Sequence, residues 1–173
     1  MTLSPDQDAR YLEAAAAHGG ALQRLARATE ANEERRRDLL QDMHVALWKS
    51  LAAFDGRCSV RTWVYRVAHN VAATHVDKER RTQRGVVTLD AIAEMPDVVS
   101  IAGEAEHGEA LSRLYELIRR LKAPDRQIIT LYLEEMDAAA ISEIIGISPG
   151  AVATRISRLK SHLAAKFHET ANV

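Results

Sequence analysis

The sequence predicts an all-α protein of two small helical domains joined by a linker, the C-terminal one a helix-turn-helix. Ala, Leu, Arg and Glu dominate the 173 residues, and they favour helices over strands. Apolar residues recur at helical spacing through most of the chain. Two such stretches, between residues 137 and 163, are separated by a turn that contains Gly146.

The first domain, residues 1–84, is expected to contain three or four packed helices. A helix over residues 5–28 would bury Leu12, Leu22 and Leu25, with a bend or break at His18-Gly19-Gly20. A second helix, over residues 37–51, has an apolar face comprising Leu39, Leu40, Met43, Ala46, Leu47 and Leu51, extended by Phe54.

A polar turn at Asp55-Gly56 precedes a third helix, which Ser59 is placed to cap. Its apolar side is expected to comprise Val60, Trp63 or Val64, Val67 and Val71. The remaining surface would carry Arg61, Tyr65, Arg66, His69 and Asn70, and the cations Lys78, Arg80, Arg81 and Arg84 follow. Rings and amides beside guanidinium groups suit unpaired bases next to a phosphate backbone. A solvated amphipathic helix explains the same residues.

Charge is segregated along the chain, so the net charge of −1 conceals basic surfaces. Residues 85–108 contain no Lys or Arg and include Asp90, Glu94, Asp97, Glu104 and Glu106. They form an expected acidic linker, which is too apolar for a plain flexible tether. Residues 144–168 contain no Asp or Glu and include Arg155, Arg158, Lys160 and Lys166.

The second domain, residues 109–173, begins with a helix whose stripe is Leu111, Leu114, Tyr115, Ile118 and Leu121. After a second helix from Asp125, Asp137 is placed to cap a short helix that Gly146 ends in a left-handed turn. Ser148 then caps the last helix, with Pro149 in its first position. This order is typical of a helix-turn-helix.

The last helix is expected to expose Ala153, Thr154, Ser157, Arg158 and Ser161, with Arg155 and Lys160 on its flanks. Short side chains allow close approach to a DNA major groove. Arg158 could reach a base edge, whereas the flanking cations suit phosphates. A purely structural helical hairpin would tolerate the same residues.

Several function classes find no support. Cys58 is the only cysteine, which rules out an internal disulfide, and it is interpreted as an ordinary loop residue. The seven histidines show no metal-binding spacing, and the chain contains no phosphate loop or nucleophile–base–acid grouping. We expect neither a cofactor nor an enzyme. No apolar run is long enough for a membrane span, so we expect a cytoplasmic protein without membrane insertion.

Motifs in both domains carry a family resemblance. They are Asp38-Leu39-Leu40-Gln41-Asp42, Phe54-Asp55-Gly56, Arg61-Thr62-Trp63-Val64-Tyr65-Arg66-Val67-Ala68-His69-Asn70, Ala123-Pro124-Asp125-Arg126-Gln127 and Arg155-Ile156-Ser157-Arg158-Leu159-Lys160. In this order, around an intervening linker, they resemble the bacterial RNA polymerase sigma factors of the two-domain, extracytoplasmic-function subfamily of the sigma-70 family.

The resemblance implies a factor that binds core RNA polymerase and directs promoter-specific initiation by recognising and melting promoter DNA. Core binding would fall to Asp38, Leu39, Gln41 and Asp42. The minus-ten element would be bound by Arg57, Ser59, Arg61, Trp63, Tyr65, Arg66, His69 and Asn70. The minus-thirty-five element would be read by Ser148, Ala153, Thr154, Arg155, Ser157, Arg158 and Lys160.

The resemblance also implies an acidic linker in the path of the RNA and admits an anti-sigma factor, of which the sequence gives no sign. One departure is Ala153, which stands where family members commonly carry Lys or Arg. Its lack of charge should weaken contact with the minus-thirty-five DNA or change the bases read. Asp38 and Asp42 have a second explanation, since acidic residues near a helix N-terminus are favourable in themselves. The alternative function is a helix-turn-helix regulator that acts without docking on core polymerase.

Overall fold

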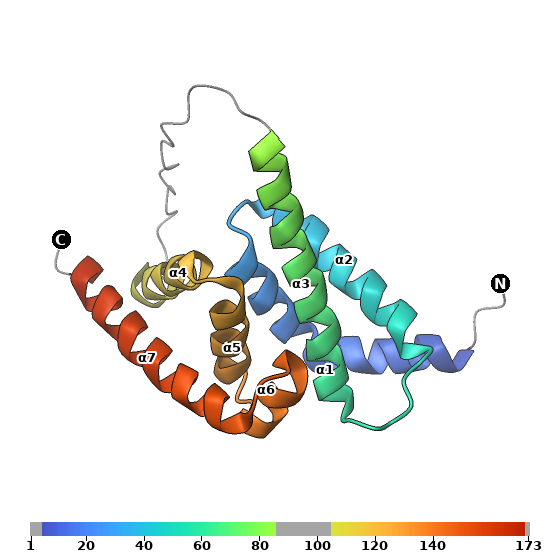
Figure 1. Cartoon of the computed structure of the whole chain (residues 1–173). Helices are drawn as coiled ribbons and strands as arrows, with labels where there is room; N and C mark the ends of the chain where they lie inside the picture. Colours follow the sequence, from blue (N-terminus) through green and yellow to red (C-terminus); the bar gives the residue numbers. More distant parts are fainter. Residues whose placement is uncertain (1–4, 86–104, 172–173) are drawn as a thin grey trace.

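The computed structural model describes residues 5–85 and 105–171, which form seven helices and no strand (Figure 1). The first module consists of α1 (Pro5–Thr29), α2 (Glu33–Leu51) and α3 (Val60–Gly85). The second module consists of α4 (Ala105–Arg120), α5 (Ala123–Leu133), α6 (Ala138–Ile145) and α7 (Pro149–Ala171). The predicted all-α class with a C-terminal helix-turn-helix is confirmed.

The first module packs its three helices around aliphatic side chains that include Leu22, Leu39, Met43, Leu47 and Val64. Each such burial contributes about 1.5–3 kcal/mol before the entropy cost of folding. Ser59 caps α3 as predicted, because its hydroxyl accepts the Thr62 N–H at 3.0 Å. The cap fixes where the loop 52–59 ends and α3 begins.

One expectation for α1 is wrong, and another is narrowed. Of the predicted bend or break at His18-Gly19-Gly20, the helix shows no break, and Figure 1 shows it changing direction where it passes behind α3. Leu12 is 64% exposed, because it lies on the side of α1 opposite the buried Ala14. The prediction placed it on the same stripe as Leu22 and Leu25, which are indeed buried.

The second module forms the turn that the sequence predicts. Asp137 accepts the Ala140 N–H at 2.8 Å, and Gly146 adopts a left-handed φ of 83°. Ser148 accepts the Ala151 N–H at 3.2 Å at the start of α7. Ile141 and Val152 meet in the core with no exposed surface. The turn therefore fixes α7 across α5 and α6, with its other side in solvent.

The buried side chain of Arg126, on α5, links this helix to the C-terminal end of α4 by hydrogen bonds. Its guanidinium donates to the carbonyls of Arg119 at 2.7 Å and Leu121 at 3.0 Å, where α4 ends. The side chain is 9% exposed, and this burial lowers the pKa of Arg126, as do the charges of Arg80 and Arg119. The Ala-Pro-Asp-Arg-Gln motif thus contains a residue with an internal structural role.

The two modules pack directly against each other. One apolar cluster contains Ala21, Ala28 and Tyr65 of the first module together with Tyr115 and Ile118 of the second. The second module meets the first along two helices, with α4 and α5 beside α1, and α5 and α6 beside α3 (Figure 1). Most of the expected linker, residues 86–104 of 85–108, lies outside the described residues. The helix α4 begins at Ala105, earlier than the predicted start of the second domain at residue 109.

Candidate nucleic-acid interface

The outer face of α7 is open to solvent. Ala153, Thr154, Ser157, Arg158 and Ser161 are all exposed. In the part of the chain that the structure describes, the Arg158 guanidinium has no hydrogen-bond or ion-pair partner. This face of the helix thus combines short side chains, which allow close approach to a DNA major groove, with a guanidinium that is free to bind.

The cations beside this face are held by neighbouring helices. Arg155 lies 3.5 Å from the Asp125 carboxylate of α5. The Lys160 ammonium donates to the Tyr132 hydroxyl at 3.3 Å and lies 5.4 Å from the centre of that ring. Ser148 uses its hydroxyl as the helix cap. Of the residues predicted to read the minus-thirty-five element, Arg158 is therefore the one best placed for a base edge.

On α2, Asp38, Gln41 and Asp42 are exposed and share one side of the helix. Leu39 is not available to a partner, because its side chain is fully buried in the first-module core. The sequence pattern already placed it beside the apolar face, so its assignment to core binding is corrected. Val45, one turn beyond Asp42, is 43% exposed. It adds an apolar side chain to the surface formed by Asp38, Gln41 and Asp42, which the sequence did not predict.

The loop before α3 exposes Arg57, whose guanidinium pairs with the Asp55 carboxylate. The Arg57 backbone N–H and guanidinium lower the pKa of Asp55. Gly56 takes a φ of 76°, a conformation that disfavours any residue with a Cβ, and so sets the turn. Asn70 on α3 is also exposed. Of the predicted minus-ten residues, Arg57, Ser59, Arg61 and Asn70 are thus exposed.

Trp63 packs between α2 and α3. Its indole N–H donates to the Ser50 hydroxyl at 3.1 Å, and its ring meets Phe54 edge-on at 5.3 Å. The side chain is half-buried. Because one face and the N–H are already used inside the module, Trp63 fixes the position of α3 on α2 and is not a free stacking platform.

Four of the predicted minus-ten residues, Arg61, Tyr65, Arg66 and His69, are directed toward the second module. Tyr65 is 4% and His69 is 2% exposed, so the expectation that they lie on a solvent surface is wrong. Arg66 donates to the Glu143 carbonyl at 3.4 Å. Positions 61, 65 and 69 form one stripe along α3. The second module covers this stripe at Tyr65 and His69, whereas Arg61 stays exposed.

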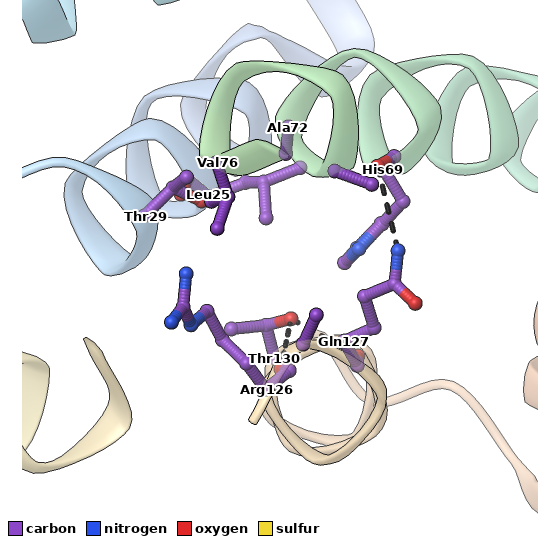
Figure 2. Close-up of a pocket in the computed structure, with 10 residues that line it drawn as sticks. Leu25, Thr29, His69, Ala72, Val76, Arg126, Gln127 and Thr130 are labelled. Atoms are coloured by element: carbon purple, nitrogen blue, oxygen red, sulfur yellow. Dashed lines mark hydrogen bonds between the residues drawn. The ribbon is translucent and has the colours of Figure 1, made fainter. Parts of the chain in front are cut away.

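His69 occupies the middle of this covered stripe. Figure 2 shows it beside Gln127 at one end of a small cavity lined by α1, α3 and α5, and the Gln127 amide donates to the His69 carbonyl at 3.4 Å. The ring Nδ1 is buried without a partner among the described residues. Burial lowers the pKa of His69 to about 4, although the Glu134 charge acts in the opposite direction. The imidazole is therefore neutral at neutral pH.

Glu134, at the end of α5, was not predicted as a functional residue. Its carboxylate accepts two hydrogen bonds from the Arg24 guanidinium, at 2.6 and 2.7 Å, and one from the Tyr65 hydroxyl at 3.3 Å. Its carbonyl accepts from Arg61. The bond to Glu134 raises the pKa of Arg24, and burial with the Glu134 charge raises that of Tyr65. A lone Glu near a helix end gives no sequence signal for this role.

No group of three His, Cys, Asp or Glu side chains in the described ranges is placed to hold a metal ion. Among those same residues, no helix is long and apolar enough to cross a membrane.

Comparison with known proteins supports both modules. The family description "Sigma-70 region 2" matches residues 15–82, and "Sigma-70, region 4" matches residues 111–163. RNA polymerase sigma factor CnrH of Cupriavidus metallidurans is 27% identical over 161 residues, covering 87% of this chain and 82% of that protein. The extracytoplasmic-function sigma factor SigW of Bacillus subtilis is 26% identical over 129 residues, covering 70% and 69%.

A solved structure shares the fold. It is the sigma factor RpoE of Bartonella quintana in complex with the anti-sigma factor NepR, with a TM-score of 0.68, 18% identity and coverage of 96% of this chain and 98% of that one.

Proposed function

Because the chain belongs to the extracytoplasmic-function subfamily of the sigma-70 family and directs promoter-specific transcription initiation, we propose how its two modules divide that work. The first module docks on core RNA polymerase and takes the minus-ten element. The second module reads the minus-thirty-five element. The observation that carries this division is the exposed face of α7, held by the helix-turn-helix and presenting an unpaired Arg158.

The core-binding surface is the side of α2 that carries Asp38, Gln41, Asp42 and Val45. Carboxylates around an exposed apolar side chain suit a basic partner helix, because the charges steer the encounter and the apolar contact contributes burial. Leu39 supports this surface from beneath. Helix-dipole stabilisation explains neither Asp38 nor Asp42, because α2 begins at Glu33 and both residues lie beyond its first turn.

In the second module, Arg158 contacts a base edge while Arg155 and Lys160 approach phosphates. Arg155 and Lys160 already have internal partners, Asp125 and Tyr132, which they share with or exchange for DNA oxygens. Thr154 and Ser157 allow the helix to lie close to the base pairs. Because Ala153 is uncharged, this face has one cation fewer than in family members that carry Lys or Arg at this position.

In the first module, Arg57, Ser59, Arg61 and Asn70 are exposed to DNA, and Tyr65, Arg66 and His69 contact it once the second module moves away. Trp63 contributes by holding α3 in register with α2. Each base transferred from the duplex to a ring or polar pocket gains on the order of 1–3 kcal/mol, which offsets lost stacking.

The chain performs no covalent chemistry in this scheme, and its place of action is the cytoplasm, where RNA polymerase works. The similarity in fold to RpoE bound to NepR supports the expectation that an anti-sigma factor also binds this chain.

The test is run-off transcription with purified core polymerase on genomic promoter fragments. The wild-type chain is expected to direct initiation from a limited promoter set. Replacing both Asp38 and Asp42 with Ala should weaken core binding on the order of tenfold, because charged rim residues act mainly on association. Glu13→Ala, which removes an exposed carboxylate on α1, is the matched control.

The alternative makes an opposite prediction. If no promoter-directed transcript forms with core polymerase, and the free chain binds duplex DNA tightly by itself, the protein acts as a helix-turn-helix regulator and the proposed division of work is wrong.

A further inference from the structure

We propose that an arginine cluster at the junction of the two modules binds a short phosphate chain, such as that of an inorganic polyphosphate or a nucleoside triphosphate. The cluster takes one guanidinium from each of five helices: Arg27 of α1, Arg36 of α2, Arg80 of α3, Arg119 of α4 and Arg126 of α5. None of these residues belongs to the surfaces assigned above to core polymerase or promoter DNA. The inference therefore goes beyond the proposed function.

Contacts and helix geometry bring the members of the cluster together. Arg119 donates to the Arg27 carbonyl at 2.9 Å, and Arg126 donates to the Arg119 carbonyl at 2.7 Å. Val76 of α3 lines the same small cavity as Arg126. Arg80 lies one turn beyond Val76 on the same side of α3. Four of the five arginines thus meet where the C-terminal ends of α1 and α4 approach α3 and α5.

Electrostatic interactions add Arg36 to this group. Burial is the main reason that the pKa of Arg119 lies below its ordinary value. The charges of Arg36 and Arg27 lower this pKa further, whereas those of Glu116 and Glu30 act in the opposite direction. The cluster is therefore a place of mutual repulsion between cations.

Little negative charge compensates the cluster. In the ranges that the structure describes, none of the five guanidinium groups forms an ion pair. The Glu30 carboxylate already accepts the Asn32 N–H at 2.8 Å and lies 3.0 Å from the His75 ring. Cations that are held together away from bulk water repel each other, so an anion bound among them stabilises the arrangement.

Unpaired buried nitrogen atoms at the inner end of the cluster are a second, independent sign of a ligand. Arg126 is 9% and His69 is 2% exposed, and neither the Arg126 Nε nor the His69 Nδ1 has a partner among the described residues. Figure 2 shows the two side chains at opposite ends of one cavity, which has a volume of about 20 Å³. This volume admits about one water-sized group. A single phosphate oxygen fits there, with the rest of the chain outside, beside the exposed Arg27 and Arg80.

A purely structural role explains only part of the cluster. Arg119 and Arg126 donate to carbonyls in the last turns of α1 and α4, where cations are favourable, and Arg27 lies in such a turn itself. Arg36 is different, because it lies near the N-terminal end of α2, where a cation is unfavourable. Arg80 makes no side-chain hydrogen bond or ion pair in the described part of the chain. Helix-end stabilisation therefore accounts for neither Arg36 nor Arg80.

The arrangement favours a compact ligand over a nucleic-acid backbone. The guanidinium groups converge from five helices, and those of Arg36, Arg119 and Arg126 belong to partly or fully buried residues. A duplex extends its phosphates along a line. Neighbouring phosphate groups of a short chain instead concentrate several charges at one place, and guanidinium groups bind phosphate oxygens by strong, charge-assisted hydrogen bonds.

The test is isothermal titration of the full-length chain with sodium tripolyphosphate, without Mg²⁺ and at constant ionic strength. The wild type should show saturable binding of one tripolyphosphate per chain. Arg80→Gln and Arg36→Gln should each weaken the affinity by about tenfold, because each removes a charge-assisted hydrogen bond. Lys78→Gln is the matched control, since it removes a cation from the opposite side of α3, and it should bind like the wild type.

Two further measurements identify the ligand and check the fold. Adenosine triphosphate without Mg²⁺ should bind more tightly than tripolyphosphate if the nucleoside is also recognised, and no more tightly if the phosphate chain alone is recognised. The midpoint of thermal unfolding of the wild type should rise with tripolyphosphate concentration, because the ligand binds the native chain. Without ligand, Arg80→Gln should unfold at the wild-type temperature, since its exposed side chain has no partner in the described ranges.

Four results would overturn the site. The wild type could show no saturable binding, sulfate at matched ionic strength could stabilise the chain as much as tripolyphosphate does, or Arg80→Gln and Arg36→Gln could bind like Lys78→Gln. A duplex oligonucleotide could also displace tripolyphosphate and lose affinity in the same two variants, which would make the cluster a nucleic-acid surface. None of these measurements involves core polymerase, so they are independent of the proposed function.

Discussion

Acid should destabilise the native chain through His69, which is buried in the neutral form between α3 and α5. Burial lowers its pKa to about 4 from the ordinary 6.5. Below about pH 6.5 the unfolded chain binds a proton at this ring, whereas the native chain does not. The free energy of unfolding is therefore highest above that pH and falls as the pH decreases toward 4. The charge of Glu134 acts on the ring in the opposite direction and raises the pKa of His69, but burial outweighs it.

The expected magnitude follows from the gap between the two pKa values. Each pH unit in this window costs about 1.4 kcal/mol, so the loss attributable to His69 is about 2 kcal/mol at pH 5. The assay is urea denaturation from about pH 8 to about pH 5, comparing the wild type with His69→Gln, which cannot titrate. The difference in unfolding free energy between the two should shrink by about 2 kcal/mol across the window.

His168→Gln, at an exposed position of α7, is the control and should keep the wild-type slope. Parallel curves for the wild type and His69→Gln would refute the reasoning, because they would mean that His69 takes up its proton equally in the native and unfolded chains. His18, whose pKa is also lowered by burial and by Arg61, titrates in both proteins and cancels in the comparison.

Two further predictions concern the second module. Arg158→Ala should lower promoter use with a severity that depends on the minus-thirty-five sequence, costing about 1–3 kcal/mol where a base contact is lost. Arg155→Ala should reduce all promoters alike, and a uniform loss for Arg158→Ala in promoter-variant transcription would make it a phosphate contact instead. Asp137→Ala should lower the unfolding free energy by about 1 kcal/mol, because α6 loses its N-cap. Asp137→Asn should retain most of that stability in thermal unfolding, and an equal loss would exclude capping as the cause.

The local features of this protein are determined by the sequence alone. Ser59, Asp137, Gly146 and Ser148 act through atoms within a few residues of themselves, so their capping and turn roles follow from residue type and position. The buried stripe of α2 and the helix-turn-helix follow from apolar periodicity in the same way. The α7 face was likewise predictable, because one side of a helix is exposed when the other is buried.

The position of one module on the other was decided only by the tertiary structure. Arg24 and Glu134 are 110 residues apart in sequence, and Arg66 and the Glu143 carbonyl are 77 apart. Helical periodicity identifies the side of α3 that faces its own module, but it gives no sign that a second body covers the opposite side. Tyr65 and His69 therefore look solvent-facing in the sequence, and they are buried because non-local docking, which no spacing rule encodes, supplies their second set of neighbours.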